Sequence, residues 1–333
     1  MTEPPTESSE DRLIAKYFMP LATSSGAFGL LDDAAVLTPP PGCDLVLKTD
    51  AIIGGVHFFP DDPADTVAQK ALRVNISDLA AKGATPLGCL LSLGMPVGVS
   101  ESWLAAFSDG LGADIARFNC PLFGGDTVRT PDAIMVSITV IGTVPVGKMV
   151  RRAGATPGDH IFVTGSIGDA ALGLNLRKDP SVRTRWNLSN AEHDFLAQRY
   201  LIPEPRIAIA KTLGEFASAA MDVSDGLVGD LQKLCRASGV SAEVEAASVP
   251  LSAAARKALG AEPALIEILL TNGDDYEVLA AVPPGRLMAF LAAASKAGVP
   301  VTDIGVIAEG VDAPHFVQDG RVLKFARRSF SHF

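Results

Sequence analysis

The sequence predicts an α/β (α+β) protein of two domains, each a mixed sheet packed with helices. Strand-like and helix-like segments alternate along most of the chain, as they do where helices cover a sheet. A stretch near residues 145–158, rich in proline, glycine and basic residues, interrupts this alternation, which then resumes. The chain has 333 residues, of which 48% are hydrophobic, and this is enough for two ordinary cores.

The first domain is expected to span residues 13–147, after a polar, proline-rich tail at 1–12 that is predicted to be disordered. One of its helices has Asp65 as a candidate N-cap and Gly83 as a stop signal, and the next is entered through Ser100. In chain order, the expected elements are a strand at 45–49, a helix at 65–82, a strand at 87–93, a helix at 100–118 and a strand at 133–144.

The second domain is expected to span residues 148–333. Near its end, the pair Asp319-Gly320 is typical of a type I′ turn between two short strands. The expected elements are a strand at 160–164, a helix at 224–238, a strand at 276–281, a helix at 286–297 and a hairpin at 316–323.

Charge and composition exclude several classes of protein. The net charge of −10 argues against nucleic-acid or membrane-surface binding, which both favour basic patches. The acidic start is unlike a secretory signal, and no uncharged run is long enough for a membrane span, so a cytoplasmic protein with reduced cysteines is expected. The histidines are dispersed, which argues against a histidine-based zinc site.

Several aspartates follow apolar runs, at the point where each run breaks into a polar turn. Carboxylates that converge on one place repel each other unless a cation neutralises them, so a cluster implies a divalent metal. Hard oxygen ligands favour Mg²⁺ or Ca²⁺. The aspartates of these segments are Asp32, Asp33, Asp50, Asp126, Asp222 and Asp225.

Each of these segments also has a structural interpretation. Adjacent acids such as Asp32 and Asp33 occur in solvated turns and helix caps. Gly124 and Gly125 allow a close backbone approach to phosphate oxygens, but they also fit a simple turn. On the predicted helix at 65–82, Asp78 lies on an apolar stripe, where it could bind a metal or pair with a neighbouring basic side chain.

The segment Asp222-Val223-Ser224-Asp225-Gly226 gives the strongest single signal. A strand is expected to deliver Asp222 and a helix to begin at Ser224, which gathers three oxygen-bearing side chains at a helix N-terminus. N-capping by Ser224 would explain two of the three and leave Asp222 unexplained.

A turn at residues 165–169 is weakly similar to a phosphate loop. The P-loop and Rossmann glycine motifs are absent from the sequence.

Taken together and in order, these segments resemble the thiamine-monophosphate kinase family, within the aminoimidazole ribonucleotide synthetase-like superfamily. The resemblance runs from about residue 12 to the end of the chain. It rests on residues 31–35, 48–50, 57–58, 74–81, 124–127, 154–159, 222–227 and 273–277.

The resemblance implies ATP-dependent phosphorylation of thiamine monophosphate to thiamine diphosphate, with several Mg²⁺ ions. It also implies a homodimer formed through the N-terminal domains, with ATP and Mg²⁺ between the two domains of each chain. The N-terminal domain would bind metal and ATP, and the C-terminal domain substrate and ATP. Another ATP-using synthetase of the superfamily is the alternative, and a catalytically silent metal-binding protein is a more distant one.

Carried over position by position, the resemblance implies roles for individual residues. The metal site would involve Asp33, Lys48, Thr49, Asp50, Asp78, Asp126, Asp222 and Asp225, of which Asp50, Asp126 and Asp225 are expected to be catalytic. Contacts to ATP would come from Gly125, Asp126, Arg152 and Ser224, and contacts to the substrate from His57, Asp274 and Phe330.

Three positions depart from the family pattern. Leu31 stands where glycine is usual, Lys48 where serine or threonine is usual, and Asp274 where glutamate is usual. Lys48 could supply charge in place of a hydroxyl group, which puts one peripheral metal in question. All the central carboxylates are retained.

Overall fold

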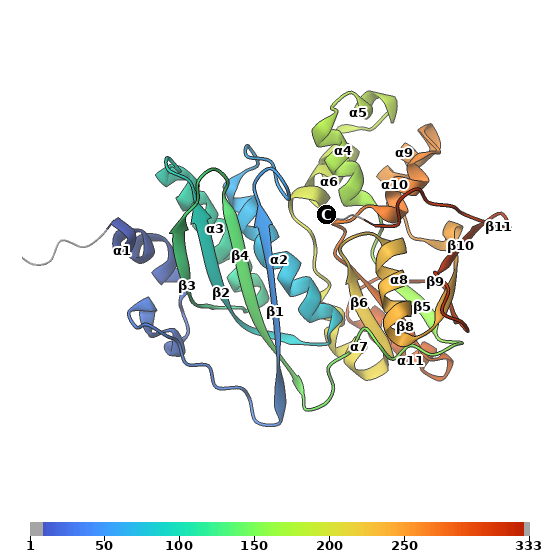
Figure 1. The fold of residues 1–333 in the computed structure, drawn as a ribbon, viewed down its shortest axis with the longest axis horizontal. Helices are drawn as coiled ribbons and strands as arrows, with labels where there is room; N and C mark the ends of the chain where they lie inside the picture. Colours follow the sequence, from blue (N-terminus) through green and yellow to red (C-terminus); the bar gives the residue numbers. More distant parts are fainter. Residues whose placement is uncertain (1–8, 330–333) are drawn as a thin grey trace, which may run out of the picture. The chain divides into compact units, whose positions relative to one another are not determined.

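The computed structural model describes residues 9–329, and its internal contacts divide the chain into two compact units (Figure 1). Unit 1 comprises the chain up to residue 75 together with 86–145, and unit 2 comprises 76–85 and the chain from 146 onward. Helix α2 (Ala64–Ala81) contributes its first part to unit 1 and its last part to unit 2. In the part of the chain described, no helix combines the length and apolar character needed to cross a membrane.

Unit 1 contains a four-stranded mixed sheet in the order β1-β4-β2-β3. Strands β1 and β4 run antiparallel, whereas β2 and β3 run parallel. Side chains alternate along β1, so that Val46 and Ile52 are buried while Leu47 is exposed. The elements are β1 (Cys43–Ile53), β2 (Thr85–Met95), β3 (Leu122–Arg129), β4 (Met135–Pro145) and helix α3 (Glu101–Phe118).

The N-terminal segment of unit 1 is made of short helical pieces. The part of the predicted tail that the structure describes is helical, because α1 covers Ser9–Leu13. Helix η1 (Ile14–Phe18) buries Tyr17 and Phe18, and η2 (Met19–Leu21) follows it directly. Helix η3 (Ser25–Leu30) leads to the loop that carries the paired aspartates.

Unit 2 contains a seven-stranded mixed sheet in the order β11-β10-β7-β9-β5-β8-β6. Its core includes Val223 and Leu227 in one cluster and Phe162 and Phe290 in another. The strands are β5 (His160–Thr164), β6 (Ala219–Val223), β7 (Ser241–Glu245), β8 (Glu277–Val282), β9 (Val301–Ala308), β10 (His315–Gln318) and β11 (Arg321–Val322).

Helices of unit 2 include a group that precedes β6 and a group that follows β7. The segment between them, α8, follows β6 directly in the chain. The helices are α4 (Asp169–Lys178), α5 (Val182–Arg185), α6 (Asn190–Leu201), α7 (Ala210–Phe216), α8 (Leu227–Ser238), α9 (Ala253–Ala261), α10 (Leu265–Thr271) and α11 (Leu287–Lys296). The short pieces η4 (Ile207–Ile209), η5 (Ala246–Ser248) and η6 (Pro284–Arg286) precede α7, α9 and α11.

The predicted class of two mixed sheets packed with helices is confirmed, and several local signals are correct. The Ser100 hydroxyl accepts a hydrogen bond from the Trp103 N–H at 3.1 Å and caps α3. The Asp319-Gly320 turn joins β10 to β11, and both residues have a positive φ, as a type I′ turn requires. The N-cap prediction for Asp65 is wrong, because α2 begins one residue earlier and places Asp65 in its first turn.

Candidate active site

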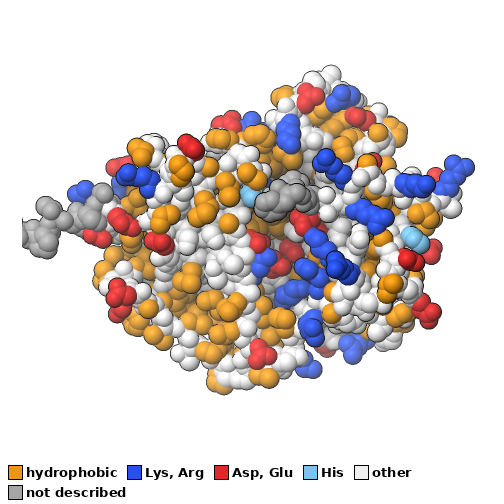
Figure 2. Space-filling view, in the orientation of Figure 1, with side chains coloured by type: hydrophobic (Ala, Val, Ile, Leu, Met, Phe, Trp, Pro, Cys, Tyr) orange, Lys and Arg blue, Asp and Glu red, His pale blue; other side chains and the backbone are white. Residues whose placement is uncertain are grey.

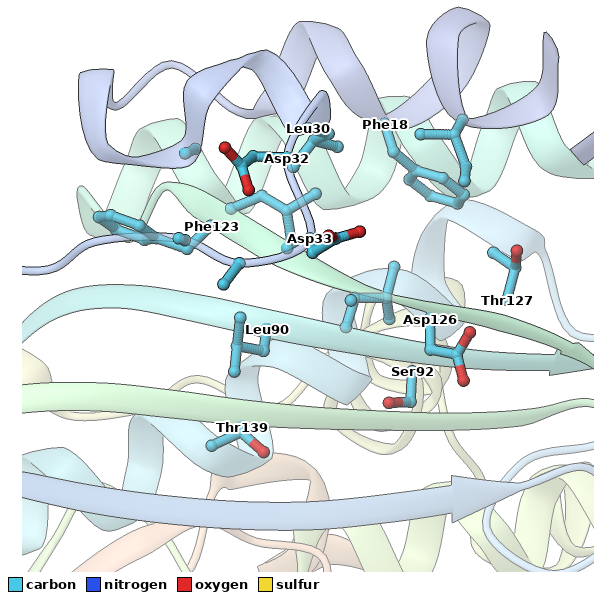
Figure 3. Close-up of a pocket in the computed structure, with 18 of the residues that line it drawn as sticks. Phe18, Leu30, Asp32, Asp33, Leu90, Ser92, Phe123, Asp126, Thr127 and Thr139 are labelled. Carbon is cyan, nitrogen blue, oxygen red and sulfur yellow. The ribbon is translucent and has the colours of Figure 1, made fainter. Parts of the chain in front are cut away.

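A cavity of about 750 Å³ lies in unit 1 between the N-terminal segment and the sheet (Figure 3). One wall is the loop after η3, with Asp32 and Asp33, and the other includes Ser92, Asp126 and neighbouring strand residues. Two of the three acidic segments of unit 1 that follow apolar runs therefore reach the same cavity. Its remaining lining is largely apolar and includes Phe18, Leu30, Leu90, Phe123 and Ile141.

The sequence suggests a strand end or a turn for Asp126, and this is wrong, because Asp126 lies within β3. In the pairing of β2 with β3, Ser92 stands opposite Asp126 and Leu91 opposite Gly125. Ser92 and Asp126 are exposed whereas Leu91 is buried, so the carboxylate of Asp126 lies on the solvent-facing side of the sheet. That side is the one that forms the cavity wall.

The two glycines before Asp126 meet different surroundings. A Cβ atom on Gly125 would lie 1.8 Å from the backbone oxygen of Leu91, so β2 and β3 can approach as they do only if this residue has no side chain. A Cβ on Gly124 would make ordinary contact, at 3.6 Å from the Leu90 side chain. Close strand pairing therefore explains Gly125 without any ligand.

We expect Gly125→Ala to destabilise unit 1 by about 1–3 kcal/mol, the usual cost of forcing extra volume into a packed position. The matched variant Gly124→Ala should change the free energy of unfolding by much less. Urea denaturation of both variants measures the difference. Equal stabilities would show that the backbone of β2 can move aside.

Strand β1 distributes its three predicted site residues over both faces of the sheet. Lys48 and Asp50 lie on the same side as the buried Val46, and Thr49 lies on the other. The Lys48 ammonium is 3.1 Å from the Asp50 carboxylate. Thr49 is bonded across the sheet to Thr139, with 3.0 Å between the hydroxyl oxygens. Asp50 is thus inside β1, and the prediction of a strand-end position is wrong for it as well.

His57 lies in the turn that follows β1, and its ring orientation is fixed by the backbone. Its Nδ1 atom accepts a hydrogen bond from the Ile53 N–H at 3.0 Å. In the neutral ring the proton is therefore on Nε2, which can donate to a ligand. Lys70 also donates to the backbone oxygen of His57, at 3.2 Å.

In unit 2, the segment Asp222–Gly226 forms the end of a strand and a turn, and not the start of a helix. Asp222 is buried in β6, and α8 begins at Leu227, so the prediction that the helix starts at Ser224 is wrong. The backbone N–H groups of Ser224 and Asp225 both donate to Oδ2 of Asp230, each at 2.9 Å. A carboxylate from the first turn of α8, and not the Ser224 hydroxyl, holds the turn in place.

Lys233 is bonded to Asp225 of this turn and to Asp230 of α8. Its ammonium donates to Asp225 and to Oδ1 of Asp230, the latter at 2.8 Å. Burial disfavours the charged amine, but the hydrogen bonds to the two carboxylates raise the pKa of Lys233 overall. Burial also raises the pKa of Asp230, and the hydrogen bond from Lys233 opposes that rise.

The segment from Gly273 to Glu277 packs directly on the Asp222–Asp225 turn. The N–H of Asp274 donates to the Ser224 carbonyl oxygen and that of Tyr276 to the Val223 carbonyl oxygen, both at 2.9 Å. Asp274 and Tyr276 have φ values of 73° and 51°, which are unfavourable for residues with side chains. The hydrogen bonds maintain this backbone, and they bring Ser224, Asp225 and Asp274 together.

A buried ion-pair network anchors the end of the same segment. Glu277 is fully buried, and its two oxygens lie 2.6 Å from Nε and 2.6 Å from Nη2 of Arg206. Arg199 donates to the same carboxylate at 2.8 Å, and the Thr164 hydroxyl at 2.7 Å. Such a carboxylate, with two guanidinium partners and a hydroxyl donor, keeps its position.

Asp275 lies inside the same unit and explains the glycine turn at residues 165–169. Its carboxyl accepts hydrogen bonds from the N–H groups of Gly168 at 2.7 Å and Ala170 at 3.3 Å. Burial raises the pKa of Asp275 well above its ordinary value. These two hydrogen bonds give the turn a structural explanation that needs no phosphate.

The remaining predicted residues lie outside these groups or outside the described chain. Asp78 is half-buried in the last part of α2. Arg152 is exposed in the loop between β4 and β5, where its backbone oxygen accepts a hydrogen bond from Ser238 at 3.4 Å. Phe330 lies outside the described residues.

The aspartate and threonine side chains predicted for the metal site fit a hard divalent cation, since carboxylates and hydroxyls are the donors that Mg²⁺ prefers. Among residues 9–329, however, no three His, Cys, Asp or Glu side chains already form a metal-binding group. Asp50 and Asp225 are instead bonded to lysine ammonium groups. Binding of a cation by these acids therefore requires side chains to rearrange.

The sequence interpretation missed Lys233, Asp230 and the Glu277 network. Asp230 and Lys233 are one helical turn apart, a spacing that could have indicated a pair. Glu277 belongs to the predicted segment, but its arginine partners are more than 70 residues away in the chain. Nothing in the local sequence indicates them.

Comparison with known proteins places both units in one family. Residues 31–144 match the model for the N-terminal domain of AIR synthase related protein, and residues 156–316 match the model for its C-terminal domain. The two matches cover most of unit 1 and of unit 2. The fold expected from the resemblance is thereby confirmed.

Similar proteins cover nearly the whole chain. A thiamine-monophosphate kinase of Caulobacter vibrioides is 42% identical over 99% of this chain and 91% of its own length. A crystal structure of thiamine-monophosphate kinase from Stenotrophomonas maltophilia has a TM-score of 0.82 and 38% identity, covering 94% of this chain and 96% of that one. The structure of AaThiL complexed with AMPPCP and TMP has a TM-score of 0.75 and 31% identity, with 92% and 97% covered. The chain belongs to the thiamine-monophosphate kinase family.

Proposed function

We propose that this protein transfers the γ-phosphate of ATP to thiamine monophosphate, giving thiamine diphosphate and ADP, in a Mg²⁺-dependent reaction. Family membership over nearly the full length supports the reaction. The relative AaThiL, which is complexed with AMPPCP and TMP, supports both ligands. The observation in this chain that carries the proposal is the cavity of unit 1, where Asp33, Gly125 and Asp126 meet beside an apolar lining.

The cavity suits a nucleotide with its metal. Apolar side chains such as Leu30 and Phe123 can contact a base, while the polar end supplies carboxylates. Asp33 and Asp126 would hold Mg²⁺ in unit 1, with Thr49 as a further ligand on the same side of the sheet, whereas Asp50, on the other side, would hold a separate Mg²⁺. In unit 2, Asp222 and Asp225 would hold Mg²⁺, as would Asp78. We assign Gly125, Arg152 and Ser224 to the ATP phosphates.

The chemistry needs positioning more than a base. The acceptor is a phosphate monoester with a second pKa of about 6, so it is mainly a dianion at neutral pH and nucleophilic without proton removal. The obstacle is repulsion between two anions, which bound Mg²⁺ reduces by neutralising phosphate oxygens. The fixed His57 ring, through Nε2–H, and Asp274 would orient the substrate. We propose direct in-line transfer without a phosphoenzyme.

Product analysis tests the reaction. The protein is incubated with ATP and Mg²⁺, together with thiamine monophosphate, free thiamine or an acyclic precursor of an aminoimidazole ring. Equal amounts of ADP and thiamine diphosphate, formed only with thiamine monophosphate, are expected. ADP formed only with the acyclic precursor would favour the alternative synthetase and reject the proposal. No nucleotide turnover with any acceptor would indicate the catalytically silent alternative.

We also propose that the protein is a homodimer formed through the exposed face of the unit 1 sheet. This face carries Leu45 and Leu47 on β1 and Val128 on β3, which are 43%, 67% and 44% exposed. Hydrophobic side chains are prominent over these strands in Figure 2. The solvent-facing side of a sheet is ordinarily polar, so apolar side chains exposed on both outer strands indicate a covered surface.

We expect Leu47→Asp to convert the dimer to a monomer, because it places a charge on the apolar face. Val97→Asp is the control, since Val97 is 79% exposed but lies in the loop after β2. Light scattering coupled to gel filtration gives the mass of each. A monomeric parent protein, or a Leu47→Asp variant that stays dimeric, would contradict this interface.

A further inference from the structure

Lys233 is held in a fixed position beside an acid that we have assigned to Mg²⁺. Asp230 is fully buried, and one of its oxygens is occupied by the N–H groups of Ser224 and Asp225. Its other oxygen binds the Lys233 ammonium at 2.8 Å. The ammonium is therefore anchored by a group that cannot move away, and from this anchor it reaches the Asp225 carboxylate.

This arrangement has a consequence for cation binding. A divalent ion that binds Asp225 must approach a carboxylate already bonded to a positive charge, and the two cations repel each other. The Asp225 oxygen that Lys233 holds can bind the ion only if its bond to Lys233 is given up. Asp230 keeps the ammonium nearby in either case, because its other hydrogen bonds come from backbone N–H groups and not from the Asp225 carboxylate.

We propose that Lys233 competes with Mg²⁺ for Asp225 and thereby sets the metal affinity of unit 2. The proposal rests on the assignment of Asp225 as a metal ligand in the proposed function. Metal binding at Asp225 is then an exchange of one cation for another and not an addition to a free carboxylate. Lys233 acts on the metal through Asp225, so it is a positioning residue.

The test measures Mg²⁺ binding to the full-length protein without nucleotide, by calorimetric titration and by the rise of Tm with Mg²⁺ concentration. Lys233→Met should tighten Mg²⁺ binding about tenfold, the equivalent of one charge-assisted hydrogen bond that no longer has to be broken. Lys233→Gln, which can still donate to Asp230, should show the same effect if the methionine variant folds poorly. Lys233→Arg keeps the charge and should bind Mg²⁺ like the parent.

Lys257→Met is the matched control. Lys257 is 37% exposed, against 38% for Lys233, and it also binds a carboxylate at 2.8 Å, that of Glu192. Its replacement should leave Mg²⁺ affinity unchanged. An equal gain in this control would attribute the effect to net charge and overturn the proposal.

Asp225→Asn separates this proposal from the proposed function. If that variant loses Mg²⁺ binding while Lys233→Met and Lys233→Gln bind like the parent, the competition is rejected and the metal role of Asp225 stands. If Asp225→Asn binds Mg²⁺ as the parent does, the metal role of Asp225 is rejected, and the competition with it.

Discussion

Asp126→Asn is expected to lower kcat by about 10²–10³-fold while the protein stays folded. The side chain is exposed on the cavity side of β3, and asparagine has the same shape, so the sheet is not disturbed. The change removes one negative charge from the acids that would hold Mg²⁺. Turnover is measured as ADP formation at saturating Mg²⁺, and the fold by circular dichroism and Tm.

Asp132→Asn serves as the control, because Asp132 is equally an exposed acid of unit 1 but lies in the loop between β3 and β4. Its kcat should match that of the parent. Near-native turnover of Asp126→Asn would remove Asp126 from the metal site. A large fall in Tm would instead mean that the carboxylate has a structural role.

Glu277→Gln is expected to lower the free energy of unfolding of unit 2 by about 3–5 kcal/mol. The substitution leaves the guanidinium groups of Arg199 and Arg206 without the buried carboxylate that neutralises them. It also places an amide NH₂ among hydrogen-bond donors. Urea denaturation followed by fluorescence measures the loss.

The control for this prediction is Glu192→Gln, which breaks an ion pair with Lys257 at an accessible position. Its denaturation midpoint should remain close to that of the parent, since exposed pairs contribute little. If Glu277→Gln is as stable as Glu192→Gln, the buried network does not anchor the Gly273–Glu277 segment.

Features with a local cause could be predicted from the sequence. The Ser100 cap and the Asp319-Gly320 turn each depend on a few neighbouring residues, and both are correct. The helix predicted at 65–82 agrees with α2 to within one residue at each end, because its apolar pattern is long. The acidic segments can be recognised from family motifs because each motif is a contiguous run of residues.

Features with a distant cause could not be predicted. The Gly124-Gly125-Asp126 segment is a strand because it pairs with β2, and the pair of glycines alone favoured a turn. Ser224 has a hydroxyl group that could cap a helix, but the Asp230 carboxylate, further along the chain, accepts the hydrogen bonds that hold this turn. The φ values of Asp274 and Tyr276 are imposed by hydrogen bonds to the preceding turn, and no propensity indicates them.

Single-turnover transfer of labelled phosphate tests the central claim most directly. The protein is mixed with ATP labelled at the γ-phosphate, with and without Mg²⁺ and thiamine monophosphate, and quenched within one turnover. We predict label in thiamine diphosphate only when both Mg²⁺ and thiamine monophosphate are present, and none on the protein at any time. Label on the protein, or ATP consumption without labelled thiamine diphosphate, would contradict direct transfer between the two phosphates.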